Sequence, residues 1–137
     1  LRPGILDDFG LAAAVEWQAE EFQKRTGVAC RTSLPPDEFD LSKEKSTNLF
    51  RILQESLTNI IRHANATEVE IKLSEKEATL VLEILDNGKG ISDTAITNPR
   101  SFGLIGIRER VHSLGGEVDI AGIPDEVTRI IVKMPIS

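Results

Sequence analysis

Apolar and polar positions follow two different periods along this chain, and the period distinguishes expected helices from expected strands. Apolar residues recur every three or four positions in three segments, so we expect helices over residues 10–26, 42–64 and 104–114. In other segments, apolar and polar residues alternate one by one. These alternating segments predict strands over residues 28–33, 69–73, 80–85, 117–121 and 127–134.

The order of these elements indicates the fold class. The later strands come in consecutive pairs instead of alternating strictly with helices. This order predicts an α+β fold in which helices cover one face of a mixed sheet. A length of 137 residues and a hydrophobic fraction of 40% suit one domain with a single core.

The charge balance disfavours some classes of partner. A net charge of −6 opposes nonspecific contact with nucleic acid or with anionic membranes, so we expect neither. The sequence contains no apolar stretch of membrane-spanning length and no recognisable signal peptide. The single cysteine, Cys30, cannot form an internal disulfide, which fits a reducing compartment. Because the chain begins at Leu1 instead of Met, we expect it to be part of a larger protein.

The most informative motif, Asp-Asn-Gly-Lys-Gly over residues 86–90, follows the predicted strand over residues 80–85. Asp86 at the end of a buried strand can accept a hydrogen bond from an exocyclic amine such as that of adenine. Gly88 and Gly90 let the backbone turn where side chains would collide with a ligand. The alternative is an ordinary turn, which such Asn-Gly pairs commonly form.

A second group of polar residues lies on the predicted long helix. Glu55, Asn59 and His63 are spaced four apart, so they share one helical face, and Arg62 adjoins them. Asn59 offers a hard oxygen ligand for Mg²⁺, and Arg62 suits a phosphate oxyanion. Glu55 could orient a metal-bound water or accept a proton. The alternative is a solvated helix face in which Glu55 pairs with Asn59 and Arg62.

Two glycines, Gly103 and Gly106, bracket the start of the last predicted helix. Free backbone amides at a helix start can meet phosphate, and glycine hinges suit a lid that closes over a nucleotide. The preceding residues 91–102 are polar, are interrupted by Pro99, and are predicted to form the mobile loop of that lid. The alternative is a helix start that packs closely against the sheet.

These three groups occur in a fixed order along the chain. They read Glu55-x-x-x-Asn59-x-x-Arg62-His63, Asp86-Asn87-Gly88-Lys89-Gly90 and Gly103-Leu104-x-Gly106. In this order they resemble the N box, the first glycine box and the second glycine box of the ATP-binding domain of sensor histidine kinases, within the Bergerat (GHKL) fold. Residues 1–11 resemble the segment that joins the dimerisation helices to this domain in kinases of the DesK/NarX subclass. The resemblance covers essentially the whole chain.

The resemblance implies a two-layer α/β sandwich with a mainly antiparallel sheet, and ATP bound between the long helix and the lid. It implies that Asp86 takes the adenine amino group, that Asn59 holds Mg²⁺ and that Glu55 lies near the γ-phosphate, with Glu55 and Asn59 as catalytic residues. Thr128 would lie beside the adenine, although residues 124–127 lack the glycine-rich turn frequent in the family. The implied ATP-binding residues are Asn59, Arg62, His63, Asp86, Gly88, Gly90, Ile91, Gly103, Leu104, Gly106 and Thr128.

The family reaction moves the γ-phosphate of ATP to a histidine on a dimerisation helix and then to an aspartate of a response regulator. The resemblance implies that residues 1–10 are a linker from that helix and that residues 11–137 are the catalytic domain. Neither His63 nor His112 lies in a sequence that resembles the acceptor, so we expect the isolated chain to bind Mg-ATP without autophosphorylation. We expect a cytoplasmic location, a homodimeric parent protein and a monomeric fragment; membrane anchoring of the parent stays open.

Three other interpretations remain open. The first is a Bergerat-fold ATPase of the gyrase or MutL kind, which hydrolyses ATP to drive a conformational clamp. The second is an anti-sigma kinase that phosphorylates serine. The third is a non-catalytic module that binds ATP and a partner without transferring phosphate. The lead over residues 1–11 favours the sensor kinase over the first two.

Overall fold

The computed structural model describes residues 4–61, 66–88, 104–123 and 127–136. The helices are α1 (Gly4–Phe9), α2 (Leu11–Thr26), α3 (Lys43–Asn59) and α5 (Leu104–Ser113). The strands are β1 (Ala29–Ser33), β2 (Glu68–Lys76), β3 (Thr79–Asp86), β4 (Glu117–Ile123) and β5 (Val127–Pro135). Each expected helix and strand occurs within the described residues, whereas the predicted end of the long helix at residues 62–64 and the predicted loop over residues 91–102 lie outside them. α1 is an additional short helix in a segment for which no helix was predicted. Within the described ranges, no helix is long and apolar enough to cross a membrane.

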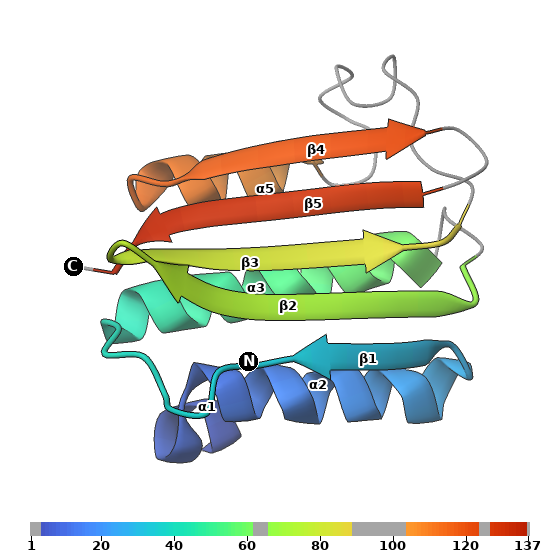
Figure 1. Ribbon diagram of the computed structural model, residues 1–137, viewed down its shortest axis with the longest axis horizontal. Coiled ribbons are helices and arrows are strands. Elements are labelled where there is room, and N and C mark those ends of the chain that lie inside the picture. Colours follow the sequence, from blue (N-terminus) through green and yellow to red (C-terminus); the bar gives the residue numbers. More distant parts are fainter. Residues whose placement is uncertain (1–3, 62–65, 89–103, 124–126, 137) are drawn as a thin grey trace.

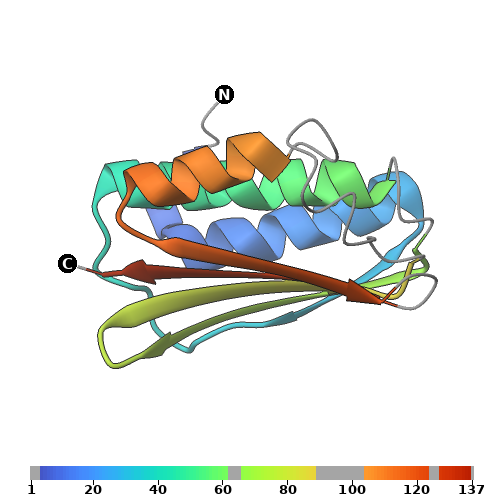
Figure 2. The same ribbon diagram turned by 90° about the horizontal axis from the view of Figure 1, so that it is seen from above.

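The strands form one five-stranded sheet in the order β1-β2-β3-β5-β4. β1 pairs with β2 in parallel, whereas the other pairs are antiparallel. Figure 1 shows the sheet face-on, and Figure 2 shows the helices gathered on one side of it. The predicted two-layer α+β sandwich, with helices on one face of a mixed, mainly antiparallel sheet, is therefore confirmed.

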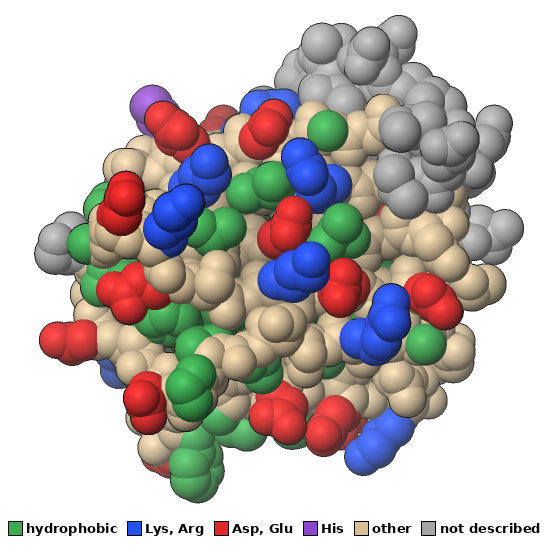
Figure 3. All heavy atoms as spheres, viewed as in Figure 1, with side chains coloured by type: hydrophobic (Ala, Val, Ile, Leu, Met, Phe, Trp, Pro, Cys, Tyr) green, Lys and Arg blue, Asp and Glu red, His purple; other side chains and the backbone are tan. Residues whose placement is uncertain are grey.

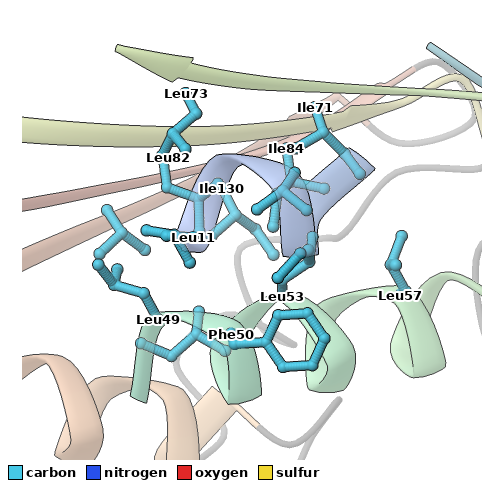
Figure 4. Packing of buried hydrophobic residues seen from close by; sticks show 14 of the residues in the cluster. Leu11, Leu49, Phe50, Leu53, Leu57, Ile71, Leu73, Leu82, Ile84 and Ile130 are labelled. Atoms are coloured by element: carbon cyan, nitrogen blue, oxygen red, sulfur yellow. The ribbon is translucent and has the colours of Figure 1, made fainter. Parts of the chain in front are cut away.

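The core lies between α3 and the central strands. Along β3, Leu80, Leu82 and Ile84 are buried, while the residues between them are partly exposed. Figure 4 shows Leu82 and Ile84 directed toward α3, which contributes Leu53 and Leu57. Burying one such side chain fully stabilises the fold by roughly 1.5–3 kcal/mol. These contacts hold the helix layer on the sheet.

The opposite face of the sheet carries a mixture of charges, as Figure 3 shows. The carboxylate of Glu83 on β3 lies 3.9 Å from the guanidinium of Arg129 on β5, and Lys72 lies 3.8 Å from Glu70 on β2. Exposed ion pairs of this kind contribute at most about 1 kcal/mol each. Oppositely charged side chains thus lie next to one another on the outer face, whereas the buried polar groups of β3 and β5 lie on the helix side.

A carboxylate from a distant loop caps helix α2. Gly10 stands at the N-cap position and has no side chain that could bond the free amides of the first turn. Glu38 takes this role, because its Oε1 accepts a hydrogen bond from the Ala12 amide at 2.8 Å and its Oε2 accepts one from the Ala13 amide at 3.0 Å. Gly10 has a φ of 96°, and a β-carbon there would lie 2.6 Å from the Glu38 carboxylate. Gly10 and Glu38 together therefore fix the turn between α1 and α2.

Replacing Glu38 with alanine is expected to destabilise the fold by about 1–2 kcal/mol. The physical reason is that two amides of α2 lose their acceptor and the helix N-terminus loses a negative charge. Urea denaturation followed by circular dichroism measures this loss. Asp37→Ala, which removes an exposed carboxylate from the same loop, is the matched control and should change stability by less than about 0.5 kcal/mol. Equal stability of the two variants would contradict the capping role of Glu38.

Candidate functional site

Asp86 is a buried carboxylate at the end of the central strand β3. Its side chain lies on the same face as Leu82 and Ile84, and only 5% of the residue is exposed. The backbone amide of Gly88 donates a hydrogen bond to Asp86 Oδ1 at 2.9 Å. Burial raises the pKa of Asp86, and this hydrogen bond partly opposes the rise. A carboxylate in such surroundings is a strong acceptor for a ligand that brings its own donor.

Thr128 lies beside Asp86 on the neighbouring strand. The two residues are direct partners in the antiparallel register of β3 and β5. Only 3% of Thr128 is exposed, and its Oγ1 has no hydrogen-bond partner in the described part of the chain. A buried polar atom without a partner costs roughly 1–3 kcal/mol. The Asp86 carboxylate, a hydrogen-bond acceptor, thus lies beside a hydroxyl that a bound group could satisfy. Such a pair fits the edge of an adenine ring.

Asn87 has a structural function within the first glycine motif. Its side-chain Oδ1 accepts hydrogen bonds from the amides of Thr67 and Glu68, each at 2.9 Å, and its Nδ2 donates to Thr67 Oγ1 at 3.0 Å. These bonds tie the end of β3 to the start of β2. Asn87 therefore braces the backbone that carries Asp86, and sequence reasoning assigned it no role.

Glu55 on α3 is directed toward helix α5. Its Oε2 lies 3.8 Å from Nε of Arg110. Its Oε1 would lie 3.2 Å from a β-carbon at Gly106, so the missing side chain of Gly106 leaves room for the carboxylate. The ion pair thus crosses to another helix, whereas the sequence suggested partners on α3. Gly106 lies inside α5, and the hinge function predicted for it stays a prediction.

The polar ends of three elements meet at one end of the molecule. Figure 1 shows the C-terminal ends of α3 and β3 and the start of β5 on the same side. Asn59 is the last residue of α3 and is half-buried, Asp86 ends β3, and Thr128 is the second residue of β5. Glu55 lies one turn before Asn59 on the same helix. The structure therefore places Asp86, Thr128 and Asn59 at the same end of the molecule, and their predicted roles toward a nucleotide and a metal stay predictions.

Several predicted site residues lie outside the described residues, so their predicted roles stay predictions. These residues are Arg62, His63, Gly90, Ile91 and Gly103. Leu104 begins α5, and its side chain also lies outside the described part. Gly88 is buried and reaches the site through its amide, which bonds Asp86.

Comparison with known proteins defines the class to which this fold and site belong. Residues 44–137 match the family of histidine kinase-, DNA gyrase B- and HSP90-like ATPases. Because the match covers more than half of the chain, the chain belongs to this family.

Two similar proteins are a bacterial signalling kinase and a bacterial sensor protein. The chain is 34% identical to the signal transduction histidine-protein kinase/phosphatase DegS of Brevibacillus brevis, over the whole chain and 35% of that protein. It is 37% identical to the sensor protein VraS of Staphylococcus saprophyticus, over the whole chain and 39% of that protein. The chain thus spans little more than a third of the length of these relatives. The family and these relatives support its assignment as the ATP-binding catalytic domain of a histidine kinase.

A solved structure supports the fold independently. The histidine kinase domain from the Erythrobacter litoralis EL346 blue-light activated histidine kinase superposes with a TM-score of 0.78 at 21% sequence identity. The superposition covers 92% of this chain and 61% of that chain. Likeness at this identity shows that the two domains share their architecture.

Asp86→Asn is expected to stabilise the fold at neutral pH. The pKa of Asp86 is raised in the folded state, so the protonated side chain contributes to the free energy of unfolding at low pH. This contribution is lost as the pH rises through the raised pKa, because the buried carboxyl then becomes charged. Asparagine keeps an acceptor for the Gly88 amide and carries no charge. The variant should therefore melt roughly 3–6 °C above the native chain near pH 7.5, the size of shift that about 1 kcal/mol produces.

Calorimetry over a pH series checks this expectation. The advantage of Asp86→Asn should shrink toward zero as the pH falls to about 4, the ordinary pKa of aspartate. Asp119→Asn, at an exposed position on β4, is the matched control and should melt like the native chain throughout. An Asp86→Asn variant that melts at or below the native temperature at pH 7.5 would refute the destabilising role of the buried charge.

Proposed function

We propose that this chain binds Mg-ATP where α3, the end of β3 and the start of β5 meet, and that it is the catalytic part of a two-component sensor kinase. The observation that carries the proposal is the pairing of Asp86 and Thr128. One is a buried carboxylate, and the other is a buried hydroxyl whose Oγ1 lacks a partner in the described structure. Membership of the ATPase family supports ATP as the ligand.

The adenine ring would be bound by these two residues. The exocyclic amino group would donate a hydrogen bond to the Asp86 carboxylate. The hydroxyl of Thr128 would donate one to a ring nitrogen or to a bridging water. Asn87 braces the short turn after β3, and the Gly88 amide is bonded to Asp86, so the Gly88 backbone would lie next to the bound base. This part of the site provides selectivity for the base.

The phosphates and the metal would lie toward α3. The side-chain oxygen of Asn59 is a hard ligand, and Mg²⁺ typically takes one or two protein oxygens while phosphates and water complete its shell. The Glu55 carboxylate, one turn earlier on α3, would lie near the γ-phosphate. Arg62, His63 and the amides near Gly103 remain our proposed phosphate contacts. Transfer at such a site depends mainly on positioning and on neutralising phosphate charge.

In the whole protein, the γ-phosphate would pass to a histidine on a dimerisation helix and then to a response regulator. The names of the curated relatives as kinases and sensors support this reaction class. We place the chain in the DesK/NarX subclass because residues 1–11 resemble the segment that precedes the catalytic domain in those kinases. In this segment, Leu6 of α1 is buried against the domain and Phe9 is 67% exposed. A cytoplasmic location and a dimeric parent protein belong to the same proposal.

Isothermal titration calorimetry with ATP, in the presence and absence of Mg²⁺, tests the proposal. The native chain should bind more tightly with Mg²⁺, and Asp86→Ala should weaken binding at least tenfold because the base loses its acceptor. Asn59→Ala should remove the effect of Mg²⁺ and leave metal-free binding within about twofold. Asp119→Ala is the matched control. Unchanged Mg-ATP affinity in Asn59→Ala would refute the metal role, and no binding to the folded native chain would refute the proposal.

A further inference from the structure

The surroundings of Glu55 point to a function for a residue that the sequence motifs do not contain. Both carboxylate oxygens of Glu55 face α5, where Gly106 and Arg110 lie one helical turn apart. Oε2 lies 3.8 Å from Nε of Arg110, and Oε1 lies over the backbone of Gly106. The side chains of Glu55 and Arg110 are 31% and 38% exposed. The carboxylate is therefore held between two helices.

This ion pair is a weak source of stability. The distance is long for a charged hydrogen bond, and half-exposed pairs of this kind contribute roughly 0–1 kcal/mol. Its stronger effect is electrostatic and directional. A guanidinium beside one oxygen compensates the negative charge of Glu55 and keeps that oxygen turned toward α5, while Gly106 allows the close approach.

We propose that Arg110 is a positioning residue that neutralises and orients Glu55, so that this carboxylate can lie beside the γ-phosphate of ATP. This inference rests on the proposed function. Without a counter-ion, a carboxylate near the terminal phosphate would repel it. Arg110 reduces this repulsion through Glu55, without contacting the nucleotide. Its effect is therefore limited to the binding of the terminal phosphate. Adenine binding at Asp86 is independent of it.

The ratio of ATP affinity to ADP affinity is the sensitive measurement, because ADP lacks the γ-phosphate. In calorimetric titrations of this chain with Mg-ATP and Mg-ADP, Arg110→Met should weaken ATP binding about fivefold to tenfold. Its affinity for ADP should stay within about twofold. Arg110→Lys should restore most of the ATP affinity, because lysine keeps the charge and loses only the planar fork. Arg108→Met, on an exposed position of the same helix, is the matched control.

A double variant separates positioning from a general structural effect. If Arg110 acts through Glu55, Glu55→Gln should cancel the uncompensated charge, and the variant with both substitutions should recover ATP affinity to within about twofold of Glu55→Gln alone. Equal losses for ATP and ADP, no loss in Arg110→Met, or no recovery in the double variant would each overturn the inference. A folded native chain that binds neither nucleotide would instead overturn the proposed function.

Discussion

Asp86 is buried because it continues the alternation that buries Leu82 and Ile84 on β3. Side chains on a strand have only two directions, so a strand whose leucines face the helix layer also directs its last residue there. The register with β5 then places Thr128 opposite Asp86. A shift of one residue along β3 would turn Asp86 to the outer face and away from Thr128. Core packing therefore determines where the polar end of the site lies.

Helix α3 connects this core to the chemistry. Leu53 and Leu57 fix the helix on the sheet, and Glu55 leaves the same helix in the direction of α5. Because the ion pair of Glu55 with Arg110 is partly exposed, a substitution of Arg110 would change the surroundings of Glu55 at little cost in stability.

The elements that could be predicted from the sequence have strong local signals. The alternation over residues 80–85 predicted β3, and with it the position of Asp86. The register places Thr128 opposite Asp86, while its predicted contact with adenine stays a prediction. Helix α1 was not predicted, because Gly4–Phe9 is too short to show a helical period.

Contacts between distant segments could not be predicted in the same way. Nothing in the local sequence distinguishes Glu38, which caps α2, from its neighbour Asp37. Likewise, spacing along α3 suggested intrahelical partners for Glu55, whereas its ion pair is formed with Arg110 on α5. Such pairings depend on how helices pack on the sheet, and a single sequence contains no direct record of that packing.

In the proposed site, the pair formed by Asp86 and Thr128 would also account for how an acidic domain favours one nucleotide. A desolvated Asp86 and an unsatisfied Thr128 hydroxyl both destabilise the chain without ligand. A base that presents an amino group relieves the first cost, because it donates to the carboxylate. A base that presents a carbonyl at that position would place two acceptors against each other and increase the cost. In the proposed site, selectivity for adenine would thus follow from groups that destabilise the chain without ligand, so affinity and stability would oppose each other at Asp86.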